Sequence, residues 1–127
     1  MRMLVDLFGN WSGSRLAPRR FALLWVILLV ELLATLVLAA VIAVAGEGSV
    51  EPKGPAIRLA ATLGVTGLML FFVGMFNITV KRGRDIGVQG FVTGTIFFVT
   101  LMLGGVPLFF NILLALVPQD TFRAARA

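Results

Sequence analysis

Three long apolar stretches decide what this chain can fold into. They cover residues 21–45, 57–80 and 88–117, and short polar segments separate them. The first contains one charged residue, the second contains only Arg58, and the third contains none. About 20 helical residues cross the roughly 30 Å hydrocarbon core of a bilayer, so each stretch is long enough to span it. We therefore predict an all-α membrane protein with one transmembrane domain over residues 1–127.

Composition excludes several classes of function. Apolar residues make up 59% of the chain and charged residues 13%, whereas soluble domains are about one quarter charged. The chain has no cysteine and no histidine, which excludes disulfides, thiolate or imidazole metal sites and nucleophiles activated by histidine. We expect no cofactor, no metal, no catalytic residue and no enzymatic activity. The first apolar stretch is longer than the core of a signal peptide, about 7–15 residues, so we expect it to be a retained helix.

The charged segments predict the orientation in the membrane. Four arginines against one aspartate give the N-terminal segment, residues 1–17 and the two arginines after it, a charge of +3. Three cations against one aspartate give the 81–90 segment +2, whereas two glutamates against one lysine give the 46–56 segment −1. Cytoplasmic loops carry the excess of lysine and arginine. We predict a cytoplasmic N-terminus, an external 46–56 loop, a cytoplasmic 81–90 loop, and transmembrane helices over 21–45, 57–80 and 91–117.

The third apolar stretch is too long for one straight crossing. Its 30 residues would extend about 45 Å as a single helix. The segment from Gly104 to Pro107 is where a kink is expected, because proline removes a backbone donor and glycine loosens the turn. We favour one kinked crossing followed by a tail, 118–127, over a re-entrant hairpin of two half-spans. A single crossing would leave Arg123 and Arg126 outside, against the charge rule.

The first dozen residues have the pattern of a helix that lies in the membrane interface. Apolar residues recur there at helical spacing, while charged and amide residues fall between them. Trp11 is expected at headgroup depth. A frayed terminus is the alternative.

Small residues form a packing seam on each of the first two spans. On the second span they are Ala60, Gly64, Gly67 and Gly74. On the first span a comparable stripe at four-residue spacing comprises Glu31, Thr35, Ala39 and Ala43. Such seams allow close approach of two helix backbones. The seams either face each other or receive another protein. Four polar side chains are expected to form helix-packing hydrogen bonds: Thr62, Asn77, Thr95 and Asn111.

Glu31 lies near the middle of the first span, where an unpaired carboxylate is costly. Thr66 and Thr100 fall at a similar depth and are the expected hydrogen-bond partners. We expect a neutral, structural Glu31. A proton carrier and an interhelical or intersubunit tie are the alternatives.

The charged segment 81–90 has glycines, but not at the spacing of a phosphate-binding loop. Its cations are expected to contact anionic lipid headgroups. Asp85 is expected to pair with Arg15 or Arg19, forming a clasp between the first helix and the loop. The predicted headgroup and clasp residues are Arg15, Arg19, Arg20, Lys81, Arg82, Arg84 and Asp85.

Two segments together resemble the signatures of a family of small bacterial inner-membrane proteins, domain-of-unknown-function family 805. They are GSRLAPRRF before the first span and VKRGRDIGVQGF after the second. The matching residues are Gly13, Arg15, Arg19, Phe21, Lys81, Arg82, Asp85, Ile86, Gly87 and Gly90. The departures are Gly83 for leucine, Arg84 for histidine, Gln89 for serine and Phe91 for tryptophan. The resemblance implies a multi-pass protein of the bacterial inner membrane and implies no reaction.

These features favour a non-catalytic accessory or scaffold protein that docks with lipids and with a larger membrane assembly, or with copies of itself. One alternative is an oligomeric transporter or channel built around Glu31. Another is a membrane protein that binds lipid headgroups. A third is a membrane enzyme that acts on lipid headgroups, with Asp85 and its neighbouring cations at the centre. We expect no binding to nucleic acid, because the charge alternates between segments as membrane topology requires.

Overall fold

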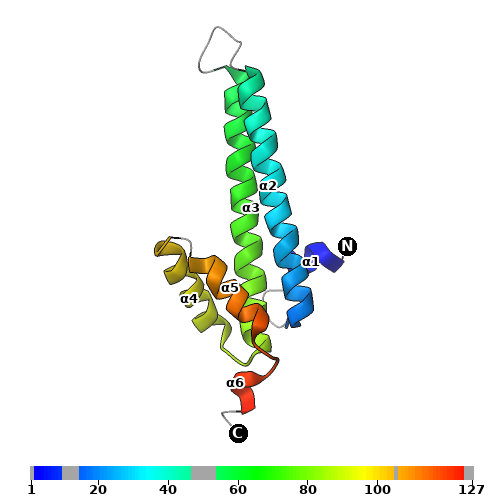
Figure 1. Cartoon of the computed structure of the whole chain (residues 1–127), viewed down its shortest axis with the longest axis vertical. Coiled ribbons are helices and arrows are strands. Elements are labelled where there is room, and N and C mark those ends of the chain that lie inside the picture. Colours follow the sequence, from blue (N-terminus) through cyan, green and yellow to red (C-terminus); the bar gives the residue numbers. More distant parts are fainter. Residues whose placement is uncertain (1, 10–14, 47–53, 105, 125–127) are drawn as a thin grey trace. The chain divides into compact units, whose positions relative to one another are not determined.

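The computed structural model describes residues 2–9, 15–46, 54–104 and 106–124, and all its regular elements are helices. This confirms the all-α prediction for the described part of the chain. Trp11 and the external loop at 47–53 lie outside it. The helices are labelled in Figure 1 and are α1 (Arg2–Phe8), α2 (Pro18–Gly46), α3 (Pro55–Asp85), α4 (Gly90–Met102), α5 (Val106–Leu116) and α6 (Thr121–Ala124).

Two of these helices, α2 and α3, are long and apolar enough to cross a membrane. Helix α2 has 29 residues and begins at Pro18, whose fixed φ and missing N–H suit the first helical position. In the most apolar 18-residue window, only 6% of α2 and 28% of α3 is buried inside the protein. The core helix of a soluble protein would be mostly buried, so these exposed apolar faces favour a membrane location.

Helix α3 continues five residues beyond its predicted end at Val80. The prediction of a loop over 81–90 is therefore wrong for its first half, because residues 81–85 form the last turn of α3. The helix ends at Asp85, and Gly87, two residues later, has φ 95°. The Gly87 N–H donates to Arg84 O at 3.2 Å and the Val88 N–H to Gly83 O at 2.9 Å, as in a Schellman motif.

The third apolar stretch folds into a hairpin of two short helices. Helix α4 ends near Gly104, which has φ 69°, and α5 packs along α4 (Figure 1). After α5 the chain returns to the end of α3, where the Asp120 N–H donates to Asp85 O at 3.0 Å. The stretch is therefore two helices that pack against each other, as in the hairpin alternative, and the number of times it crosses a membrane stays a prediction. The reversal occurs at the predicted kink because Gly104 adopts a left-handed conformation that a helix cannot continue through.

The chain divides into two compact units. One comprises residues 27–73, which are the adjoining parts of α2 and α3. There a Cβ atom added to Gly67 would lie 2.3 Å from Thr35 Cγ2, so the two predicted seams meet at this point. Ala60 is buried, whereas a Cβ atom on Gly64 would have no atom within 4 Å.

The other unit comprises residues up to Val26 and from Gly74 onward. It contains the beginning of α2, the end of α3 and the α4–α5 hairpin. Its apolar core takes side chains from every one of these segments, including Phe21, Leu24, Met75, Ile78, Phe97 and Leu114, each at most 5% exposed.

Candidate functional site

The last two turns of α3 hold the charged residues that the sequence singled out. Lys81 is 1% exposed, Arg82 is fully buried and Asp85 is 6% exposed. The prediction that Lys81 and Arg82 contact lipid headgroups is therefore wrong, because protein surrounds both side chains. Charged groups are rarely buried unless they are paired and hydrogen-bonded, so their partners define the site.

Arg82 connects two other segments to α3. Its Nε donates to Leu114 O at 2.9 Å and its Nη2 donates to Val117 O. Its Nη1 donates to the Asp85 carboxylate and, at 3.4 Å, to Leu16 O. One guanidinium thus binds the segment before α2, the end of α3 and the end of α5.

The contacts with α5 have a clear physical reason. The last four carbonyls of a helix lack partners within that helix and carry partial negative charge. Leu114 O and Val117 O lie at this end of α5. A planar guanidinium offers five N–H donors in a fixed fork, so it caps these carbonyls and still pairs with a carboxylate.

Lys81 performs a similar task for α1. Its Nζ donates to Gly9 O at 2.6 Å and to Val5 O at 3.4 Å. Asn77 lies one turn earlier on the same face of α3, and its Nδ2 donates to Leu7 O at 2.6 Å. The two side chains hold the C-terminal end of α1 against α3.

Two of the four predicted packing residues form bonds between segments, and two do not. Asn77 binds α1, as described above, and Asn111 of α5 accepts a bond from Thr79 Oγ1 at 2.8 Å. Thr62 and Thr95 instead donate to carbonyls one turn earlier in their own helices.

The predicted clasp between Asp85 and Arg15 or Arg19 is not what the structure shows. Asp85 pairs with Arg82 and not with Arg15 or Arg19. Arg15 lies 3.8 Å from the Asp120 carboxylate, with both side chains about half exposed, so this ion pair contributes little. The connection from the start of α2 to α3 runs instead through the bond from Arg82 to Leu16 O. Arg19 and Arg20 are exposed.

Gly83 allows α4 to approach the charged turn. A Cβ atom at this position would lie 2.0 Å from Thr93 Oγ1, and Thr93 is 1% exposed. Sequence reasoning noted Gly83 only as a departure from a family pattern. Its missing side chain is the signal, because a helix-interior glycine often marks a close backbone approach.

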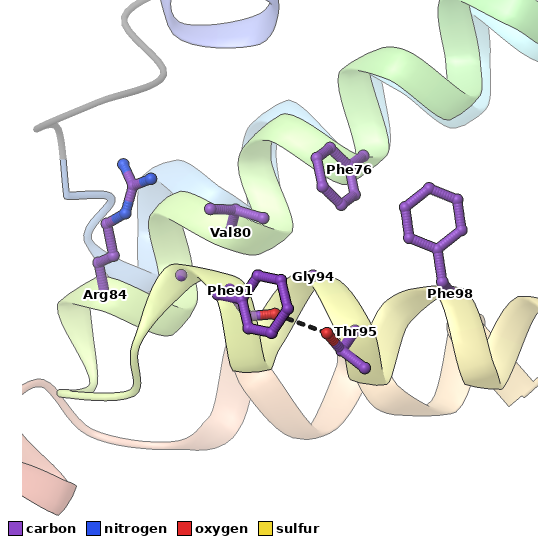
Figure 2. Close-up of a pocket in the computed structure, with 8 residues that line it drawn as sticks. Phe76, Val80, Arg84, Phe91, Gly94, Thr95 and Phe98 are labelled. Carbon is purple, nitrogen blue, oxygen red and sulfur yellow. Dashed lines mark hydrogen bonds between the residues drawn. The ribbon is translucent and has the colours of Figure 1, made fainter.

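An open groove lies beside this turn, between α3 and α4, with a volume of about 330 Å³ (Figure 2). Its walls are mainly Phe76, Val80, Phe91, Gly94 and Phe98, and Arg84 lies at one end. Sequence reasoning had placed Arg84 among the headgroup residues but had not found the groove.

Glu31 has a different partner from the two that were predicted. Thr35 Oγ1 donates to Glu31 Oε1 at 3.3 Å, and Glu31 Oε2 is buried without a hydrogen bond among the described residues. Thr66 is exposed, and the Thr100 hydroxyl donates to Phe97 O in its own helix. The partner is thus the threonine one turn later in the same helix.

The described residues contain no group of three or more histidine, cysteine or acidic side chains that could hold a metal ion. Comparison with protein-family models, with curated proteins and with solved structures found no match to this chain. The resemblance to family 805 therefore stays a prediction.

Proposed function

We propose that this chain is a non-catalytic integral protein of the bacterial inner membrane that acts as an accessory or scaffold subunit. Two observations support a membrane role: α2 and α3 are long enough to cross, and most of their apolar surface is not covered by protein. The proposal that this membrane is the bacterial inner membrane rests on the resemblance to family 805 alone.

The observation that carries the non-catalytic proposal is how Arg82 is used. Its hydrogen bonds go to three backbone carbonyls and to Asp85. Acid-base chemistry usually requires a carboxylate that a substrate can reach. Here the carboxylate of the charged motif is 6% exposed and paired with an arginine, which suits a structural element better than a reaction centre.

The proposed topology has two crossing helices and a re-entrant hairpin. Both ends of the α4–α5 hairpin lie at the end of α3, so the tail would return to the cytoplasmic side together with the charged turn. Arg123 and Arg126 would then also be cytoplasmic. This arrangement satisfies the charge rule that a third crossing would violate.

The uncovered face of α3 around Gly64 is the proposed docking surface for the larger assembly. Gly64 is the position of choice for a test, because no described atom lies within 4 Å of where its Cβ would be. A leucine there would add bulk toward a partner without disturbing the fold. Ala40, exposed on α2, is the matched control position for the same added bulk.

The test is purification in a gentle detergent followed by native mass spectrometry. We expect a second protein in fixed stoichiometry. It should be lost in Gly64→Leu and retained in Ala40→Leu, and neither variant should have a lower melting temperature than the wild type. A chain that is recovered alone, with or without lipid, contradicts the accessory role.

Glu31 supports a second candidate, an oligomeric transporter. Its Oε2 atom is buried and has no hydrogen bond among the described residues. Ionisable groups inside membranes often mark proton or ion pathways. This candidate requires a homo-oligomer in the same mass spectrum and a proton flux in liposomes that Glu31→Gln abolishes.

A further inference from the structure

We propose that the groove between α3 and α4 binds one anionic phospholipid from the cytoplasmic leaflet, with the phosphate at Arg84 and an acyl chain along the aromatic wall. This inference rests on the membrane location proposed above and adds a ligand to it.

The groove has the dimensions of a ligand site. Its volume of about 330 Å³ lies at the lower end of the range for small-molecule sites, roughly 300–1,000 Å³. It is open along one side. Figure 2 shows Phe76 and Phe98 at one end, Phe91 in the middle and Arg84 at the opposite end.

The wall of the groove is apolar apart from this one cation. Among the described residues that line it, Arg84 is the only charged one. Thr95 is the one hydroxyl, and it already donates to Phe91 O at 2.9 Å. A ligand that matches this wall is therefore a long apolar chain with a negative group at one end.

The guanidinium is held at the mouth by a close contact with the first turn of α4. A Cβ atom at Gly90 would lie 2.8 Å from Arg84 Nε, so a larger residue would displace the side chain. The first turn of α4 contains no acidic residue, and the side chain of its N-cap residue, Gln89, forms no capping hydrogen bond. The partial positive charge of a helix N-terminus therefore adds to that of Arg84.

The direction of the groove agrees with that of a lipid in the cytoplasmic leaflet. Arg84 lies in the last turn of α3, which the charge distribution places at the cytoplasmic surface. Phe76 lies eight residues earlier, about 12 Å deeper along the helix. Phe91 and Phe98 are 85% and 54% exposed, so the wall is accessible to a chain that enters from the bilayer.

The experiment uses the full chain, extracted from membranes and stripped of lipid in mild detergent. Phosphatidylglycerol and phosphatidylcholine with the same acyl chains are each titrated into the protein. Native mass spectrometry counts the lipid molecules that are bound. A phosphatidylglycerol with a photoactivatable group on its acyl chain is then crosslinked to the protein. Peptide mapping of the crosslinks shows where the bound acyl chain lies. We expect one tightly bound phosphatidylglycerol, weaker binding of phosphatidylcholine and crosslinks to α4 between Phe91 and Phe98.

Matched variants distinguish a specific lipid site from the general attraction of anionic lipids to basic surfaces. Arg84→Gln should weaken phosphatidylglycerol binding about fivefold, the contribution of one basic residue near an anionic surface. Arg58→Gln, at an exposed cation earlier on α3, should leave it unchanged. Thr95→Phe fills the groove and should remove the α4 crosslinks. Thr62→Phe is its control, because Thr62 is also exposed and bonds to the carbonyl one turn earlier.

The lipid site would be overturned by an equal loss of binding in Arg84→Gln and Arg58→Gln, by equal binding of the two lipids, or by crosslinks outside the groove. Any of these results with a membrane-extracted protein leaves the proposed membrane role intact. Recovery of the chain in the soluble fraction without detergent would overturn both.

Discussion

Arg82 and Asp85 lie one turn apart on α3, and the guanidinium of the first donates to the carboxylate of the second inside the protein. Removing one partner of such a buried pair leaves an uncompensated charge, which costs about 3–5 kcal/mol. We therefore expect Arg82→Ala and Asp85→Ala each to lower the free energy of unfolding in detergent by that amount. Arg82→Lys should recover only part of it, because an ammonium cannot reproduce the fork.

The control for this pair is Arg15→Ala. Arg15 also forms an ion pair, but both side chains of that pair are about half exposed, so the change should stay within about 1 kcal/mol. Equal destabilisation by Arg15→Ala and Arg82→Ala would show that the buried contacts are not what stabilises the unit.

The close contact between Gly83 and Thr93 predicts a second result. Gly83→Ala places a methyl group 2.0 Å from Thr93 Oγ1, and overpacking of this kind costs about 1–3 kcal/mol. Gly64→Ala is the matched control, because nothing lies within 4 Å and the better helix propensity should stabilise by up to about 1 kcal/mol. Thermal unfolding of both variants is the measurement, and Thr93→Ala should rescue part of the Gly83→Ala defect.

The capping of α1 by Asn77 and Lys81 predicts that its attachment depends on them. Leaving a buried carbonyl without its donor costs about 1–3 kcal/mol. Asn77→Leu and Lys81→Met should therefore raise hydrogen exchange in α1 and in the segment before α2, while exchange in the 27–73 unit stays unchanged. The control is Arg58→Met, an exposed cation earlier on α3. Unchanged exchange in α1 would contradict the capping role.

The α4–α5 hairpin predicts where introduced cysteines react. The chain has no cysteine of its own, so single replacements label without background. Gln89→Cys and Gln119→Cys flank the hairpin and should both react with a membrane-impermeant maleimide only from the cytoplasmic side of oriented vesicles. If the two cysteines reacted from opposite sides of the membrane, the chain would cross a third time between them and the re-entrant hairpin would be wrong.

The helical content and its main interruption were predictable because they follow from local rules. Three charge-free or nearly charge-free stretches required helices, and the Gly104–Pro107 segment required a break. The direction after the break was not predictable, since it depends on Arg82 capping carbonyls more than thirty residues away. Nothing in the local pattern distinguishes a cation that faces water from one that caps a distant helix.

The candidate site was likewise predictable in part. The charged turn was found because charges stand out in an apolar chain, and Asp85 was correctly expected to have an arginine partner. The predicted identity of that arginine was wrong, because the extension of α3 to Asp85 puts Arg82 one turn away on the same face. The roles of Gly83 and of the groove required coordinates, because both arise from the packing of α4 on α3.

The ion pair between Arg15 and Asp120 brings the approach to the first long helix next to the segment that follows the hairpin. In the proposed topology both segments lie on one side of the membrane. An engineered tandem of two copies would then need no additional crossing to keep both copies in the same orientation.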